Sequence, residues 1–223
     1  MSSESFPLTP HGRALPSIRP QAEQAHASDN FLFDAQRTVA ASIGAHQRLL
    51  EDSVTMSRIA TVARTLTDAF LRGRKAMLFG NGGSAADSQH IAAEFVGRFA
   101  IERAALPVMA LSVNTSCVTA IGNDYGFDRV FARQIEAFGN AGDVAIGIST
   151  SGNSSNVLAG LATASQLGMP TVALTGASGG KMSTSADVCI CAPSDETPRI
   201  QECHMLLGHT ICELVETGLF PKK

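Results

Sequence analysis

The sequence predicts an α/β protein built on a doubly wound parallel sheet of five strands with helices on both faces. Three observations predict this fold. Short apolar runs alternate along the chain with longer amphipathic segments, which is the order of strands and helices in α/β proteins. The runs are continuously apolar, as strands buried on both faces are. Polar loops rich in glycine or serine directly follow two of the runs.

The first elements are predicted to be a flexible arm and two helices. Residues 1–30 contain four prolines and little apolar periodicity, which is typical of a mobile segment. Residues 31–223 are predicted to form a single domain that opens with helices over residues 31–50 and 56–71, where apolar residues recur every three or four positions. Two helices before the first strand offer more apolar surface than one sheet face needs, so we expect an oligomer.

The remaining elements alternate in type. The predicted strands are residues 75–79, 108–111, 144–148, 171–174 and 188–191. The predicted helices are residues 84–95, 115–121, 128–138, 153–167 and 198–219. The crossovers between parallel strands should be right-handed.

Size, charge and cysteine content exclude several classes of protein. The chain has 223 residues, enough for one sizeable core, and its net charge of −3 gives no electrostatic reason to bind nucleic acid or a membrane surface. No apolar run is long enough to span a bilayer. The five cysteines are an odd number, which favours reduced thiols and a cytoplasmic protein. We expect Cys189 and Cys191 to face opposite sides of their strand as small core residues.

A glycine-rich loop, Gly80–Ser84, joins the first strand to its helix. Glycines allow a sharp turn close to a ligand, and the free N–H groups at a helix start favour anions. Ser84 is predicted to be the N-cap of the helix. The loop lacks the Lys-Ser/Thr ending of a nucleotide P-loop and the G-x-G-x-x-G spacing of a dinucleotide fold. It therefore favours a phosphate on a molecule smaller than a nucleotide.

His90 and Glu94 lie four residues apart on the predicted helix after this loop, so they share one face. They can meet around one metal ion or one substrate, or they can be a weak surface pair. Their place near the carboxyl end of a strand, where α/β sheets bind ligands, favours a site.

Two more polar segments are interpreted as loops that leave strand ends. Residues 149–155 offer hydroxyl and backbone donors suited to a phosphate, although a serine-rich turn that caps a helix would look the same. Residues 122–126 include Asn123 and Asp124 and can equally be a plain turn.

The last helix carries four polar candidates. By helical angle, Glu202 aligns with His209 more closely than Gln201 does, and spacing alone does not say which of the two faces a site. His204 and His209 lie well apart around the helix, so at most one of them should face it.

Taken together, these motifs resemble the phosphoheptose isomerases, the sedoheptulose 7-phosphate isomerases of the sugar isomerase (SIS) superfamily. The likeness covers about residues 31–219. Five ordered motifs carry it: Gly80–Ser84; His90 and Glu94 with Gly97-Arg98; Gly122-Asn123-Asp124; Ser149–Ser154; and Arg199-Ile200-Gln201-Glu202 with His209.

The resemblance implies a SIS fold and a homotetramer with active sites between subunits. It implies conversion of sedoheptulose 7-phosphate to D-glycero-D-manno-heptose 7-phosphate through a cis-enediol, in the biosynthesis of activated heptoses. The implied substrate-binding residues are Asn81, Gly82, Gly83, Glu94, Asn123, Asp124, Ser149, Thr150, Ser151, Ser154 and Gln201.

The resemblance also implies catalytic and metal-binding roles. Glu94 and His209 match the acid–base pair of the family. One zinc ion per subunit is expected on residues that match its ligands, which favours Gln201 over Glu202: His90, Glu94, Gln201 and His209. Such an isomerisation needs a base at carbon and an acid at the neighbouring oxygen, and zinc would polarise the carbonyl.

Two alternatives stay open at this stage. The chain could be a non-catalytic SIS protein that binds a sugar phosphate or a replication initiator, because its Thr197–Glu202 run and its Leu219-Phe220-Pro221 ending also resemble that subgroup. Those binders lose the acid–base residues that this chain keeps. The second alternative is isomerisation of another sugar phosphate, such as a hexose or a pentose phosphate.

Overall fold

A computed structural model describes residues 30–221. The predicted arm therefore lies almost wholly outside the described residues. Contacts divide the chain at Ala40 into two compact units, which are described separately, and residues 41–223 form the larger one. Helix α1 (Phe31–Glu51) begins in the first unit and ends in the second. Its first residues, Phe31 and Leu32, are exposed. No helix within residues 30–221 is both long and apolar enough to cross a membrane.

All five predicted strands are present and form one parallel sheet, as the sequence predicts. They are β1 (Ala76–Gly80), β2 (Val108–Ala110), β3 (Val144–Ser149), β4 (Thr171–Thr175) and β5 (Val188–Cys191). Their order is β2-β1-β3-β4-β5, and each neighbouring pair is parallel. This is a doubly wound sheet.

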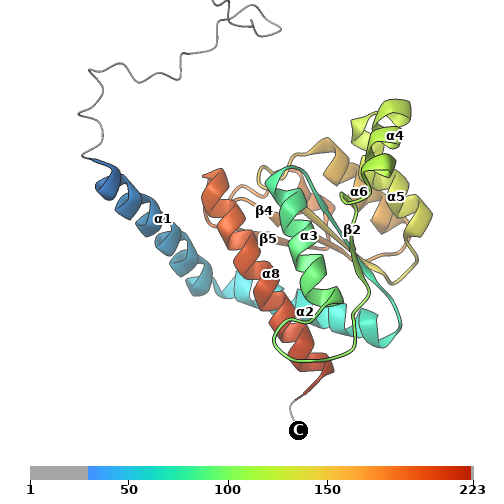
Figure 1. Ribbon diagram of the computed structural model, residues 1–223, viewed down its shortest axis with the longest axis horizontal. Helices are drawn as coiled ribbons and strands as arrows, with labels where there is room; N and C mark the ends of the chain where they lie inside the picture. Colours follow the sequence, from blue (N-terminus) through green and yellow to red (C-terminus); the bar gives the residue numbers. More distant parts are fainter. Residues whose placement is uncertain (1–29, 222–223) are drawn as a thin grey trace, which may run out of the picture. The chain divides into compact units, whose positions relative to one another are not determined.

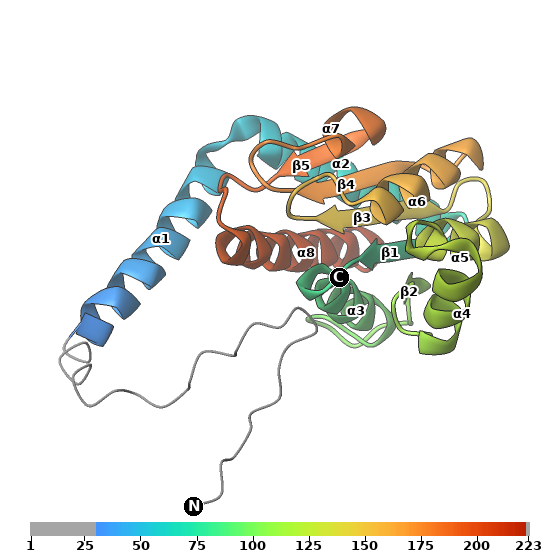
Figure 2. The same cartoon turned by 90° about the horizontal axis from the view of Figure 1, so that it is seen from above.

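Helices cover both faces of this sheet (Figures 1 and 2). They are α2 (Ser53–Leu71), α3 (Gly83–Val96), α4 (Thr115–Tyr125), the 3₁₀ turn η2 (Phe127–Arg129), α5 (Val130–Phe138), α6 (Ser155–Gln166), α7 (Met182–Ser185) and α8 (Thr197–Leu219). Successive side chains of β1 point to opposite faces of the sheet, which shows which helices cover each face. Leu78 packs with apolar residues of α2, α3 and α8. Met77 and Phe79 pack with residues of α4 to α7.

Two sequence predictions about local structure are wrong, and one short helix was missed. Ser84 is not the N-cap of α3, because Gly82 holds that position with φ +56° and Ser84 is buried in the first turn. Residues 122–126 are not a loop after a strand, since α4 continues to Tyr125 and ends at Gly126, where φ is +86°. The short helix α7 was not predicted, because four residues are too few to show a helical period.

The strand order places β1 and β3 side by side, with Gly80 opposite Ile148. The chain leaves β1 toward α3 on one face and leaves β3 toward α6 on the other face. Such a reversal of winding opens a crevice at the carboxyl ends of the two strands, and α/β sheets bind ligands in that crevice. Two loops border this crevice: the glycine loop (Gly80–Ser84) after β1 and the serine turn (Ser149–Ser155) after β3.

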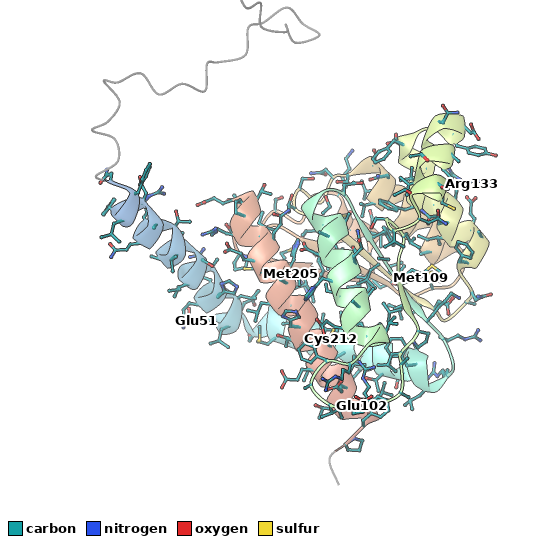
Figure 3. All side chains as sticks on the ribbon, in the orientation of Figure 1. Glu51, Glu102, Met109, Arg133, Met205 and Cys212 are labelled. Carbon is teal, nitrogen blue, oxygen red and sulfur yellow. The ribbon has the colours of Figure 1, made fainter. Side chains whose placement is uncertain are left out.

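A buried ion pair holds the loop after α3 against the end of α8. The Arg103 guanidinium lies 3.0 Å from the Glu216 carboxylate, and the two side chains are 1% and 5% exposed. Glu216 also accepts hydrogen bonds from the backbone N–H groups of Phe99, Ala100 and Ile101. In Figure 3 the neighbouring Glu102 lies beside the last turns of α8. Burial alone would raise the pKa of Glu216, but the hydrogen bonds from Ala100 and Arg103 outweigh it and lower the pKa.

We expect Arg103→Met to lower the free energy of unfolding by about 3–5 kcal/mol, because it leaves a buried carboxylate without its counter-ion. Urea denaturation at one fixed protein concentration measures this change. The matched control is Arg129→Met, which removes an exposed ion pair with Glu136 and should cost less than about 1 kcal/mol. Equal effects of the two substitutions would contradict the importance of the buried pair.

Candidate active site

Two helices on one face of the sheet bring three predicted site residues together. His90 and Glu94 project from α3, and His209 projects from α8. The Nε2 atoms of His90 and His209 lie 3.0 Å apart, and His90 Nε2 lies 3.3 Å from Glu94 Oε1. Candidate ligand atoms of the three residues all lie within 4.8 Å of one another. We call these three residues the His-Glu-His group.

The spacing of this group fits one metal ion. Metal–ligand distances of about 2.0–2.2 Å in a tetrahedral site place neighbouring donor atoms roughly 3.3 Å apart, close to the distances between these side chains. Two imidazole nitrogens that face each other can share one proton or can both donate lone pairs to a cation. The group can therefore hold a divalent metal, and without one it offers an acid and a base side by side.

A close contact between α3 and α8 brings the group together. Gly208, next to His209, packs on Ile91, next to His90. A Cβ atom added to Gly208 would lie 2.5 Å from Ile91 Cδ1, which is well inside van der Waals contact. With a Cβ at position 208, either the outer part of the Ile91 side chain or the two helices would have to move. The ring of Phe99 covers one side of His209, with ring centroids 5.6 Å apart.

The structure separates the two polar candidates at the start of α8. Gln201 lies against Gly83 in the first turn of α3, where its amide would collide with any added Cβ. Glu202 points elsewhere: it accepts a hydrogen bond from Ser42 and one from Arg199. Gln201 therefore faces the glycine loop, although helical angles by themselves aligned Glu202 more closely with His209.

His204 lies in the core and is absent from the His-Glu-His group. It is fully buried, and its Nε2–H donates to the carbonyl oxygen of Thr175, 3.1 Å away. Within residues 30–221, its Nδ1 has no hydrogen-bond partner. Burial lowers the pKa of His204 to about 4, against a smaller opposing effect of the Thr175 bond. The side chain is therefore neutral at pH 7.

The serine turn (Ser149–Ser155) gathers hydroxyl groups at the end of β3. Ser149 Oγ lies 2.9 Å from Ser154 Oγ and 3.3 Å from Ser151 Oγ. Gly152 has φ +64°, and an added Cβ would strike Gly179. Ser154 is the N-cap of α6, and its side chain makes no capping hydrogen bond. The free N–H groups of α6 and the serine hydroxyls can therefore bind an anion together. Thr150 belongs to the same turn, and its carbonyl accepts from the Gly176 N–H.

A pair of amides joins the two loops that border the crevice. Asn81 Nδ2 donates to Asn156 Oδ1 over 2.8 Å, and Asn156 Nδ2 donates to Asn81 Oδ1 over 2.9 Å. Sequence reasoning missed Asn156, because a polar residue in a helix carries no signal of a partner 75 positions away. It also missed Asp128, which accepts a short hydrogen bond from Ser155.

Asn123 and Asp124 do not join the His-Glu-His group within one chain. Both lie exposed on the last turn of α4, where Asn123 Nδ2 donates to Asp124 Oδ1. Figure 1 shows α4 well away from α8.

Asp87 is an acidic residue near the site that sequence reasoning did not single out. It lies on α3 one turn before His90, and burial raises its pKa to about 6, against the opposing effect of the His90 charge. Its Oδ2 atom is buried and has no hydrogen-bond partner within the described chain. It therefore titrates near neutral pH beside the predicted site.

Comparisons with known proteins place phosphoheptose isomerases among the relatives of this chain. The SIS domain family model matches residues 42–176. A phosphoheptose isomerase of Roseiflexus sp. (strain RS-1) is 51% identical over 193 residues, which cover 86% of this chain and 97% of that protein. The solved phosphoheptose isomerase of Neisseria gonorrhoeae is 41% identical with a TM-score of 0.78, and that of Francisella tularensis is 34% identical with a TM-score of 0.80. Each alignment covers 83% of this chain and 98% of the solved chain.

We expect Gly208→Ala to weaken metal binding by the His-Glu-His group roughly tenfold or more, because it pushes α8 away from α3. Competition titration with Zn²⁺ as the probe ion measures the affinity. Gly218→Ala is the matched control on the same helix, because a Cβ there would meet only Thr67 at an ordinary 3.4 Å. Adding Ile91→Ala to Gly208→Ala should restore the space and the affinity. Equal affinities in all variants would contradict the role of the contact.

We also expect His204 to destabilise the fold in acid. The unfolded chain protonates this side chain below about pH 6.5, whereas the folded protein does so only near pH 4. The favourable contribution of the neutral histidine is thus present above pH 6.5 and is lost as the pH falls. The unfolding free energy of the wild type, minus that of His204→Gln, should drop by about 2 kcal/mol between pH 7 and pH 5. A constant difference would show that His204 titrates normally.

Proposed function

The chain belongs to the phosphoheptose isomerases of the SIS-domain family, and on that premise we propose that it interconverts sedoheptulose 7-phosphate and D-glycero-D-manno-heptose 7-phosphate. This reaction would supply the biosynthesis of activated heptoses. The observation that carries the proposal is the His-Glu-His group, in which a carboxylate and two imidazoles from separate helices meet. An aldose–ketose isomerase needs such an acid and base at adjacent atoms of its substrate.

The phosphate would bind at the crevice between β1 and β3. We assign it to the hydroxyls of the serine turn, Ser149, Thr150, Ser151 and Ser154, with the glycine loop at Asn81, Gly82 and Gly83 beside it. A helix rises about 1.5 Å per residue, so His90 lies about 9 Å along α3 from Ser84 in its first turn. A long sugar phosphate can thus have its phosphate held at the crevice and its carbonyl end at the His-Glu-His group.

The proton transfers fall to Glu94 and His209. The Glu94 carboxylate would remove a proton from C1 of the ketose and return it to C2 of the aldose. His209 would donate a proton to the oxygen on C2 and accept one from the oxygen on C1, so that the cis-enediol forms and collapses. The side chain of Glu94 is 25% exposed, which leaves room for a substrate carbon beside its oxygen.

The ligands proposed for zinc are His90, Glu94 and His209, which meet in the His-Glu-His group. Gln201, the fourth ligand that the resemblance implies, lies against Gly83 in the first turn of α3 and not within that group. Zinc bound to the His-Glu-His group would polarise the substrate carbonyl and stabilise the negative charge that develops on oxygen. Glutamine is a weak ligand next to imidazole and carboxylate, so partial occupancy is expected. A carboxylate held on a metal is a poorer base, and Glu94 is proposed both as a ligand and as the base.

We further propose a cytoplasmic homotetramer whose active sites lie between subunits, with residues 31–223 of each chain acting as one SIS domain. Two observations support the assembly. Large apolar side chains around α4 and α5 are exposed in the single chain, including Tyr125, Phe127 and Phe138. Asn123 and Asp124, which we assign to the substrate, lie on α4, and α4 lies away from α8, the helix that carries His209, in the same chain. A neighbouring subunit could bring them to a site.

We expect the wild-type protein to form the aldose from sedoheptulose 7-phosphate, and Glu94→Gln to lower kcat by about 10³-fold or more because it removes the base. Aldose formation is followed with and without a chelator, and a loss of rate that added Zn²⁺ restores would support the metal. Glu102→Gln is the control, since Glu102 is an exposed glutamate on the following loop.

Each contrary result has a defined meaning. Binding of the sugar phosphate without turnover would favour the non-catalytic alternative. Turnover of a hexose or pentose phosphate in its place would favour the other isomerase. A near-normal rate in Glu94→Gln would remove Glu94 from the mechanism.

A further inference from the structure

Cys189 and Cys191 form a close pair of thiols on β5. Their Sγ atoms lie 3.8 Å apart, and β5 is an edge strand of the sheet. We expected the two side chains on opposite sides of the strand, and that prediction is wrong. Residues two apart on a strand point to the same face, so the Cys-x-Cys spacing itself places the sulfurs together.

The two sulfurs have different surroundings. Cys189 is buried and Cys191 is partly exposed. The Thr175 hydroxyl on β4 donates to Cys191 Sγ over 3.4 Å and lies 3.6 Å from Cys189 Sγ. The hydrogen bond from the Cys189 thiol, helped by that from Thr175, lowers the pKa of Cys191 to about 6. Sharing its proton with Cys191, together with burial, raises the pKa of Cys189. Cys191 is therefore the accessible thiolate, and Cys189 is the thiol beside it.

The position on the strand permits a bond between them. Two residues of a strand span about 6.4–6.8 Å, and the Cα atoms of a disulfide lie about 4.4–6.8 Å apart. Cys191 is the last residue of β5, and the next N–H, that of Ala192, donates to the Thr175 carbonyl. A contraction between the two cysteines would therefore act on this hydrogen bond at the end of the strand. A bridge at this upper limit would be strained and so easily reduced.

We propose that Cys189 and Cys191 form a reversible disulfide when the protein meets hydrogen peroxide. The Cys191 thiolate attacks one peroxide oxygen, the O–O bond breaks, and Cys191 becomes a sulfenic acid. The hydroxide that leaves takes up the proton that Cys191 lost and becomes water. The Cys189 sulfur then attacks the Cys191 sulfur, the S–O bond breaks, and the second water leaves with the Cys189 proton. Two thiols are oxidised and one peroxide is reduced.

The disulfide would lie next to the support of the serine turn. Cys191 Sγ packs under Gly179, where an added Cβ would lie 3.4 Å from the sulfur. The chain just after Gly179 holds the serine turn: the Lys181 N–H donates to Asn153 Oδ1, and the Met182 N–H donates to the Gly152 carbonyl. Drawing the Cys191 sulfur toward Cys189 removes part of this packing. Resting on the proposed function, we expect oxidation to weaken phosphate binding and to raise KM for the sugar phosphate several-fold.

The full-length protein is treated with hydrogen peroxide and analysed by intact mass and by thiol titration. We expect two of the five cysteines to be lost, with a mass decrease of two hydrogens that dithiothreitol reverses, and peptide mapping should place the bridge between Cys189 and Cys191. Cys189→Ser should instead yield a sulfenic acid at Cys191 that dimedone traps. Cys117→Ser is the control for another partly exposed thiol and should behave like the wild type.

Two results would overturn the inference. An unchanged mass, or a gain of oxygen without loss of hydrogen in the wild type, would show that the bridge does not form. A bridge that forms without any change in KM would overturn the link to the serine turn. The mass measurement needs no activity, so a protein that fails to isomerise sedoheptulose 7-phosphate would still test the disulfide.

Discussion

The close approach of α3 and α8 is the constraint on which the candidate active site depends. Gly208 packs on Ile91 with no room for a Cβ between them, and this contact brings His209 to His90 and Glu94. The glycine therefore has a structural reason to lie beside the histidine in the sequence. A larger side chain at this position would separate the acid from the base even though every polar residue were still present.

Two further contacts fix the positions of the segments at the two ends of the site. At one end, the buried Arg103–Glu216 pair ties the loop after α3 to α8, and Arg103 also donates to the carbonyl of Glu94. At the other end, the paired amides of Asn81 and Asn156 join the glycine loop to the start of α6. Buried charges and amides are costly unless they are paired, so each contact fixes one geometry and disfavours others. Chemistry and phosphate binding would thus share one rigid frame.

The elements and most motifs were predictable because their signals are local. Continuous apolar runs marked every strand, and the glycine and serine loops after β1 and β3 marked the crevice. Predictions were wrong where the same short pattern of residues is compatible with two local structures. Residues 122–126 contain turn-forming residues but end a helix, and Ser84 lost the N-cap to a glycine that can adopt a positive φ. The prediction that Cys189 and Cys191 face opposite sides was wrong because residues two apart on a strand point to the same face.

The sequence by itself determined the fold class, the positions of the glycine loop and the serine turn, the placing of His90 and Glu94 on one helix face, and the family, because these depend on residue type and short spacing. Spacing left the choices between His204 and His209 and between Gln201 and Glu202 open, and before the structure only the family resemblance favoured His209 and Gln201. The tertiary structure decided that His209 meets the pair while His204 lies in the core, and that Gln201 faces the glycine loop while Glu202 contacts Ser42. The tertiary structure also showed that Asn156 pairs with Asn81 and that Asp128 accepts a hydrogen bond from Ser155. Those choices depend on how whole helices cross and on which strands are neighbours, and no short stretch of sequence contains that information.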